Sequence, residues 1–146
     1  MSFKPHEIEY MKTAELARLA TIQPDGTLQN SPVGFSYNED RGTIDIHGYR
    51  MSKSRKFRNV ATNNTVALVI DDIVSRNPWR VRCLEIRGIA EQAVSDERRA
   101  EPNGDAIDTA IIRITPRRII SFGIDDTETE PHKLVVDSRD VPATPD

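Results

Sequence analysis

The chain has 146 residues, 37% of them hydrophobic and 29% charged, with a formal net charge of −3, which is typical of one soluble globular domain and excludes a disordered chain. It contains no run of 18 apolar residues and no signal peptide, so we expect a cytoplasmic protein without a membrane span, and its acidic balance disfavours nucleic-acid binding. Cys83 is the single cysteine, which excludes an internal disulfide. The three histidines are far apart and lack metal-ligand spacing, so we expect no metal site.

The first part of the chain predicts one helix and a meander of three strands. Residues 6–19 have the spacing of an amphipathic helix, with Ile8, Met11 and Leu16 near one stripe. Strands are predicted for residues 18–22, 27–37 and 43–48, with glycine-containing turns between them. In the third of these strands Ile44 and Ile46 alternate with polar residues, so both should lie on one face.

A basic segment follows the meander. Residues 50–58 carry five Lys and Arg side chains and no acid, and we call them the basic segment. Phe57, Val60 and Ala61 have the spacing of the apolar face of a helix. The free N–H groups of a helix start, together with hydroxyl and cationic side chains, suit an anion such as the phosphate-bearing tail of a cofactor. The alternative interpretation is a solvated helix face.

The second part of the chain predicts more strands. Residues 65–70 form a continuous apolar run, typical of a strand buried on both faces, and 71–78 read as a loop. A long strand is expected at 80–93, with Gly88 at a bulge or close approach. Polar residues 95–105 precede a strand at 106–114, and Pro116 should interrupt it before a last edge strand at 117–122.

These patterns predict a mainly β fold, a small, mostly antiparallel barrel of about six strands with two or so short helices. Residues 1–124 should form the single domain. Acidic, Thr and Pro residues dominate from position 125, so we expect 125–146 to be a tail that is mobile or depends on a partner.

Four short stretches, taken in order, resemble the pyridoxamine-phosphate-oxidase-like split β-barrel family over about residues 6 to 123. They are Arg18-Leu19-Ala20-Thr21-Ile22 with Asp25-Gly26, Ser31-Pro32-Val33-Gly34-Phe35, Lys56-Phe57-Arg58-Asn59-Val60, and Glu85-Ile86-Arg87-Gly88 with Ala90-Glu91. Within the family the chain is most similar to the flavin/deazaflavin oxidoreductases that use the deazaflavin coenzyme F-420. Asp71-Asp72-Ile73 with Pro78-Trp79-Arg80 resembles a subgroup that includes reductases of dehydro-tetracycline intermediates. The substrate-phosphate residues of the pyridoxamine phosphate oxidases themselves have no match, so oxidation of that vitamer is not expected.

The resemblance implies a six-stranded antiparallel split β-barrel, FMN-binding-like, that forms a homodimer with two cofactor sites at the interface. It also implies hydride transfer from reduced coenzyme F-420 to a conjugated, electron-poor substrate, such as a tetracycline-like or quinone-like molecule. The cofactor-binding residues carried over by position are Pro32, Val33, Gly34, Tyr49, Arg50, Ser54, Arg55, Lys56, Trp79 and Arg80. Pro32, Val33 and Gly34 would line the ring. Ser54, Arg55 and Lys56 would hold the phosphate and acidic tail, with Tyr49 and Arg50 nearby, and Trp79 and Arg80 would come from the partner subunit.

Several alternatives stay open at the level of sequence. The cofactor could be FMN, or the protein could be a non-catalytic flavin or deazaflavin carrier or sensor. A nucleic-acid binder would rest on the basic segment alone, which lacks interleaved aromatic residues. Tyr49 and His47 are candidate proton donors, the alternatives being a packed tyrosine and an exposed histidine at a strand end. Trp79 could equally pack in the core or at the dimer contact.

Overall fold

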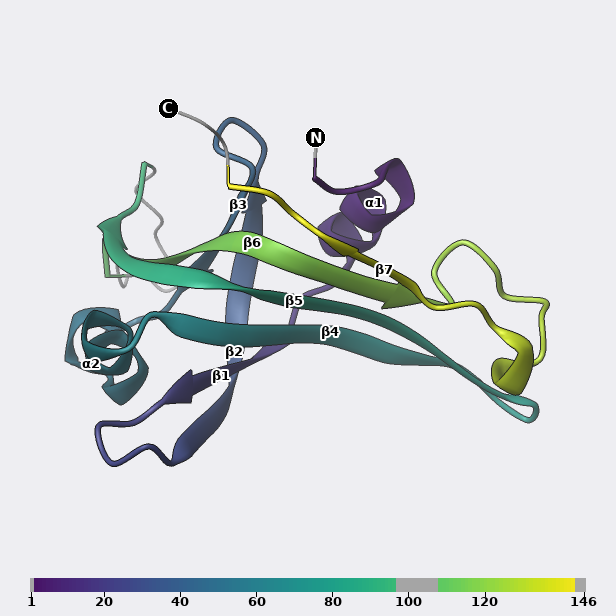
Figure 1. Ribbon diagram of the computed structural model, residues 1–146, viewed down its shortest axis with the longest axis horizontal. Coiled ribbons are helices and arrows are strands. Elements are labelled where there is room, and N and C mark those ends of the chain that lie inside the picture. Colours follow the sequence, from purple (N-terminus) through teal and green to yellow (C-terminus); the bar gives the residue numbers. More distant parts are fainter. Residues whose placement is uncertain (1, 97–107, 144–146) are drawn as a thin grey trace, which may run out of the picture.

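Six strands close into a ring, and a seventh lies on its edge (Figure 1). The computed structural model describes residues 2–96 and 108–143, and the elements in this paragraph are those of the described residues. The strands are β1 (Ala17–Ile22), β2 (Leu28–Asn38), β3 (Thr43–His47), β4 (Thr65–Arg76), β5 (Trp79–Val94), β6 (Ala110–Phe122) and β7 (Asp137–Asp140). The helices are α1 (Pro5–Thr13) and α2 (Arg55–Thr62), with short 3-10 turns η1 (Met51–Lys53) and η2 (Pro131–Lys133).

The ring is an antiparallel split barrel. The strand order is β3-β2-β1-β4-β5-β6, and β6 closes the ring by pairing with β3 over Ile112–Ile114. Two strands change partners along their length. β2 pairs with β1 up to Val33 and with β3 from Gly34 onward, and the second half of β6 leaves β3 and pairs with β7. The predicted six-stranded antiparallel split barrel is therefore confirmed.

The core forms where apolar side chains alternate along the strands. Ile44 and Ile46 are fully buried on one face of β3, as the alternation predicts. In β4, Val66, Leu68 and Ile70 are buried but Ala67 and Val69 are only half-buried. The prediction that both faces of residues 65–70 are buried is thus wrong for a single chain, because no element among the described residues covers the outer face.

Helix α1 is shorter than the predicted helix. It ends at Thr13, because Ala14 takes an extended backbone conformation and Ala17 already pairs with Val33. Leu16, assigned to the apolar stripe, is 49% exposed. The helix is held by the Tyr10 hydroxyl, which donates to Asp72 at 2.6 Å, while Arg82 binds the same carboxylate through two nitrogens.

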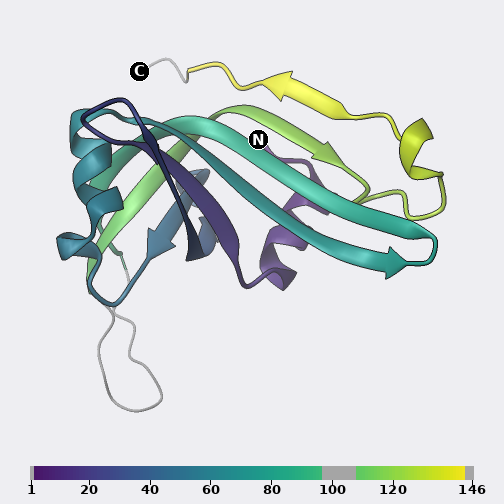
Figure 2. The ribbon, with the colours of Figure 1, turned by 90° about the horizontal axis from the view of Figure 1, so that it is seen from below.

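Helix α2 forms where the sequence predicts it, at one end of the barrel (Figures 1 and 2). Val60 is buried and Phe57 packs against the core, but Ala61 is exposed. Asn59 takes the remaining inward position, where its amide donates to the Thr21 hydroxyl at 3.0 Å and to Gln29 at 3.2 Å. A polar cluster therefore seals this end of the barrel.

Two predicted interruptions of the strands do not occur. Residues 71–78 are not a loop: β4 and β5 pair as far as Arg76 and Trp79 around a cis Asn77–Pro78 bond, because Asp72 and Arg82 face each other as an ion pair. Strand β6 continues through Pro116, which lies opposite a shift in register at Gly88, where a missing N–H is tolerated. Part of the predicted turn and strand at 95–114 lies outside the described residues.

The C-terminal segment packs on the domain in the part that the structure describes. Strand β7 pairs with the end of β6, and Arg139 forms an ion pair with the buried Glu7 of α1. The domain boundary at residue 124 stays a prediction, but residues 137–141 are not free of the barrel. Among the described residues, no helix has the length and apolar character needed to cross a membrane.

Candidate functional site

The basic segment begins helix α2, and Ser54 fixes that beginning. Its hydroxyl accepts a hydrogen bond from the Phe57 N–H at 3.3 Å and donates to the Met51 carbonyl at 2.7 Å. Ser54 is therefore an N-cap, which satisfies one of the N–H groups of the first helical turn. Ser54 thus orients the helix start, and its role at an anion stays a prediction.

The cations of the basic segment differ in how far the fold uses them. Arg55 donates to the Gln23 side chain at 3.1 Å, and Arg58 donates to the Lys53 carbonyl at 3.2 Å. Arg50 and Lys56 form no ion pair with any residue in the described part of the chain. One nearby acid, Asp108, accepts from the backbone and hydroxyl of Ser52, and these hydrogen bonds lower the pKa of that carboxyl.

The stretch Ser31–Gly34 lies where β2 changes partners. On the side that β3 occupies further along, residues 28–33 have no paired strand among the described residues, so backbone groups line an open edge. Gly34 adds room, because a Cβ built there would meet nothing within 4 Å. The Ser31 hydroxyl is buried and has no hydrogen-bond partner in the described chain. The open edge and the space at Gly34 therefore adjoin along β2, whereas the Ser31 hydroxyl lies on the inner face of the strand with the buried Val33.

His47 and Tyr49 follow directly from this stretch. His47 lies across the ladder from Gly34, and its Nε2 is 2.9 Å from the hydroxyl of Ser36. Tyr49 is 59% exposed, two residues further on and just before the basic segment. The structure thus brings together Gly34 and His47 by pairing, and Tyr49 and Arg50 by continuity of the chain.

Trp79 and Arg80 lie elsewhere. They begin β5 at the tip of the β4–β5 hairpin, and both ribbon views place this tip at the opposite end of the barrel from α2 (Figures 1 and 2). Trp79 is 52% exposed, whereas Arg80 donates to the carbonyls of Thr129 at 2.5 Å and Glu128 at 2.9 Å. A single chain therefore does not unite these two residues with the basic segment.

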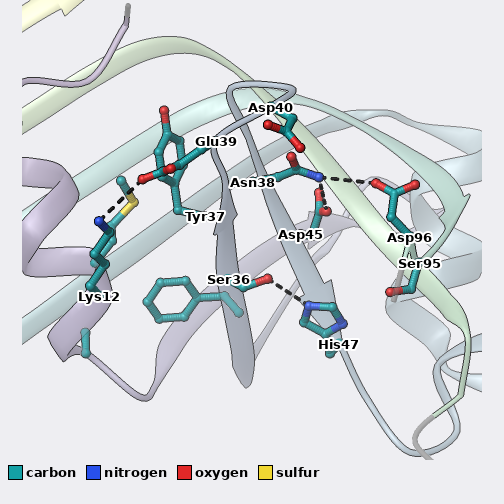
Figure 3. A pocket seen from close by; sticks show the side chains of 13 residues that line it. Lys12, Ser36, Tyr37, Asn38, Glu39, Asp40, Asp45, His47, Ser95 and Asp96 are labelled. Carbon is teal, nitrogen blue, oxygen red and sulfur yellow. Dashed lines mark hydrogen bonds and ion pairs between the residues drawn. The ribbon is translucent and has the colours of Figure 1, made fainter. Parts of the chain in front are cut away.

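A cavity of about 600 Å³ lies around the β2–β3 hairpin (Figure 3). It extends from the end of α1, past the hairpin, to the residues that follow β5. Its lining residues are Met11, Lys12, Ala14, Phe35, Ser36, Tyr37, Asn38, Glu39, Asp40, Asp45, His47, Ser95 and Asp96. Since His47 lines it and faces Gly34 across the ladder, the cavity adjoins the open edge of β2.

Most charges around this cavity are paired. Asp45 and Arg113 are each 8% exposed and bind at 3.2 Å, and Lys12 lies 3.4 Å from Glu39. Hydrogen bonds from Arg41 lower the pKa of Asp96 below its usual range. The lining is therefore polar and largely neutralised in pairs.

Sequence reasoning missed most of this cavity. The alternation in residues 43–48 places Asp45 on the same face as His47, so the sequence could have predicted that these two residues line one surface. The other members depend on the register that sets Ser36 opposite Asp45, and on the end of α1. Neither leaves a local signal in the sequence.

Comparisons with known proteins place this geometry in a family. The model of the pyridoxamine 5′-phosphate oxidase family matches residues 4–123. The 5a,11a-dehydrotetracycline/5a,11a-dehydrooxytetracycline reductase of Streptomyces rimosus is 41% identical over 141 residues, covering 96% of this chain and 97% of that protein.

Two solved structures show a similar fold. A conserved hypothetical protein of Mycobacterium tuberculosis is 17% identical with a TM-score of 0.61, covering 83% of this chain and 84% of its own. A structure described as an F420 reductase is 24% identical with a TM-score of 0.53, covering 74% of this chain and 90% of its own. At these identities the likeness shows the fold.

Proposed function

The chain belongs to the pyridoxamine 5′-phosphate oxidase family, and we propose that it is an oxidoreductase that passes hydride from reduced coenzyme F-420 to a conjugated, electron-poor organic acceptor. The observation that carries the reductase assignment is the 41% identity, over nearly the whole of both chains, to a dehydrotetracycline reductase. A tetracycline-like acceptor is therefore the first choice, with quinone-like molecules as the second.

The described residues fit a deazaflavin with an anionic tail. The ring would lie along Pro32 and Val33 at the open edge, next to Gly34, where unpaired backbone groups can meet its polar edge. When bound, such a coenzyme supplies the hydride, and the protein provides position and a dry site. Gly34 leaves the approach to the strand free of a side chain.

The basic segment would hold the phosphate and the acidic tail. Lys56 and Arg50 have no ion pair within the described residues, and Arg55 gives only a neutral amide contact, so all three can turn to an anion. A charge-assisted hydrogen bond contributes about 1.5–3 kcal/mol. Three would supply much of the roughly 8 kcal/mol that corresponds to micromolar affinity. A tail with several negative charges uses this segment more fully than one phosphate does.

We expect the complete site in a homodimer. The tip of the β4–β5 hairpin and α2 lie at opposite ends of one barrel (Figure 1). Since β5 begins with Trp79, this residue and the basic segment can meet one cofactor only if Trp79 comes from a second copy. The half-buried apolar side chains on the outer face of β1 and β4, including Ala67 and Val69, would be covered in such an assembly. Arg80 is held by carbonyls of its own chain, so we assign it to positioning the hairpin. Light scattering after size exclusion tests this, because a monomer under all conditions would refute the dimer.

Cofactor titration tests the proposal. Oxidised F-420 should quench or shift in fluorescence saturably when protein is added, and FMN should compete weakly. Preferential binding of FMN would mean that the protein is an oxidoreductase that uses FMN in place of F-420. Tight binding without turnover of enones, quinones or dehydrotetracyclines would instead favour a carrier or sensor. Absence of saturable binding to either cofactor would refute the proposal.

A further inference from the structure

We propose that His47 is the proton donor of the reduction, and that the cavity it lines binds the acceptor. This inference rests on the proposed function and adds a residue and a binding place to it. It starts from the position of His47 at the end of β3, opposite Gly34, where the cavity meets the open edge of β2.

The cavity has the size of a small-molecule site and a lining that combines polar and apolar side chains. About 600 Å³ falls within the roughly 300–1,000 Å³ of small-molecule sites. Met11 and Phe35 give apolar surface. Ser36 and Asn38 give hydroxyl and amide groups (Figure 3). An acceptor placed here would lie beside the proposed ring position at Gly34, which hydride transfer requires.

The reduction needs a proton as well as a hydride. Hydride from the reduced coenzyme forms a C–H bond at one carbon of the conjugated double bond, and the electron pair of that bond moves toward the conjugated carbonyl. One proton then completes the product at the neighbouring carbon or at the oxygen. His47 gives this proton from its imidazolium, becomes neutral, and regains a proton from water. The acceptor gains two electrons and two hydrogens, and the coenzyme is oxidised by two electrons.

His47 suits this role better than the other ionisable residues around the cavity. These are Lys12 from α1, Tyr37, Glu39, Asp40 and Asp45 from the hairpin, and Asp96 after β5. Burial raises the pKa of the Tyr37 phenol above its ordinary value, which makes it a weaker acid. Carboxylates carry no proton to give near neutral pH, and Lys12 is paired with Glu39. Imidazole is the side chain whose ordinary pKa lies nearest neutral pH, so it can both give and regain a proton there.

Ser36 acts as a positioning residue. Its hydroxyl lies 2.9 Å from His47 Nε2, and a hydroxyl can donate to the neutral ring or accept from the charged one. The same contact can therefore hold the ring before and after it gives up its proton.

The kinetic test uses His47→Gln, with His132→Gln at an exposed histidine as the matched control. Reduced F-420 and 5a,11a-dehydrotetracycline are mixed with each protein, and coenzyme oxidation is followed between pH 5 and 9. We expect His47→Gln to lower the rate by roughly 10²–10⁴-fold and to abolish the fall in rate at high pH. The control should behave as wild type, and F-420 affinity should change less than about threefold. Ser36→Ala should lower the rate less and keep the pH dependence.

A second measurement does not depend on turnover. Histidine side-chain NMR signals of the wild-type protein should respond at His47, and not at His6 or His132, when oxidised F-420 and then a tetracycline are added. A wild-type rate and pH profile in His47→Gln, or an unperturbed His47 signal with both ligands bound, would overturn the inference. If the wild-type protein binds no F-420, the proposed function itself fails, which is a different outcome.

Discussion

The buried carboxylate of Glu7 joins the two ends of the chain, and replacing it with glutamine should destabilise the protein strongly. Glu7 is 0% exposed. It accepts from the Lys4 N–H at 2.8 Å, from the Ser121 hydroxyl at 2.7 Å, and from both terminal nitrogens of Arg139 in the C-terminal strand β7. Glu7→Gln keeps the shape but removes the charge that Arg139 faces.

The size of the effect follows from this burial. Breaking a fully buried ion pair by removing one partner costs about 3–5 kcal/mol. Arg139 keeps some contact with water, since its side chain is 24% exposed, and it also lies 3.3 Å from Asp137. We therefore expect a loss of about 2–4 kcal/mol in the free energy of unfolding, or about 5–12 °C in Tm for a chain of this length.

The pH dependence gives an independent check. Burial alone would raise the pKa of Glu7, but hydrogen bonds from Arg139, Lys4 and Ser121 outweigh it and lower the pKa. A carboxyl whose pKa is lowered by folding stabilises the protein above its unfolded pKa of about 4.3, and this stabilisation disappears as the pH falls through the folded value. The difference between wild type and Glu7→Gln should therefore be constant from pH 6 to 8 and shrink below about pH 4.

Urea unfolding followed by circular dichroism measures both quantities. Glu9→Gln, an exposed position on the same helix, is the matched control and should stay within about 0.5 kcal/mol of wild type. A Glu7→Gln variant as stable as this control at pH 7 would refute the reasoning, and with it the packing of β7 on the barrel.

Three further predictions concern the contact between Tyr10 and the β4–β5 hairpin, the register shift at Gly88, and Lys56 of the basic segment. Tyr10→Phe removes the hydroxyl that binds Asp72 at 2.6 Å and should cost about 1–2 kcal/mol of unfolding free energy in urea. Gly88→Ala should cost about 2–3 kcal/mol in the same assay, because its Cβ would lie 2.4 Å from the backbone oxygen of Thr115. Lys56→Ala should weaken F-420 binding about tenfold in a fluorescence titration at low ionic strength, and less in 0.5 M salt.

Each of these has a matched control in the chain. Tyr37→Phe keeps the edge contact with Phe3 and should lower the free energy of unfolding less than Tyr10→Phe does. Equal losses would mean that the hydrogen bond from Tyr10 to Asp72 does not stabilise the fold. Gly34→Ala meets open space, so its stability should equal that of wild type while its F-420 affinity falls, and a large loss of stability would contradict the space described at Gly34. Lys133→Ala, an exposed lysine outside the basic segment, should not change the affinity; equal effects of Lys56→Ala and Lys133→Ala would point to general charge and not to a site.

Local patterns predicted the barrel well where one face of an element is buried. The alternation around Ile44 and Ile46 predicted β3, and the spacing of Phe57 and Val60 predicted α2, because each pattern reflects a face packed on the core. The helix at 6–19 was predicted too long, because the spacing of Leu16 and Leu19 fits both a helix and a strand. Pairing with β2 makes residues from Ala17 onward a strand.

Long-range pairing explains what the sequence could not predict. The interpretation of 71–78 as a loop was wrong because the charges of Asp72 and Arg82 neutralise each other only across the β4–β5 ladder. Pro116 stays within β6 because Gly88 on the neighbouring strand provides the irregularity. The cavity likewise depends on the register between β2 and β3. The basic segment was visible because its charges are adjacent in sequence, whereas its roles as a cofactor site stay predictions.

Single-turnover mixing tests the central claim most directly. Protein loaded with reduced F-420 is mixed without oxygen with 5a,11a-dehydrotetracycline, and the return of the oxidised coenzyme is followed by absorbance while the product is identified by mass. The account predicts stoichiometric oxidation of the coenzyme and a product heavier than the acceptor by two hydrogens, one of them carried as deuterium from deuterated coenzyme. Binding of F-420 with no oxidation by this acceptor or by any enone or quinone would contradict it.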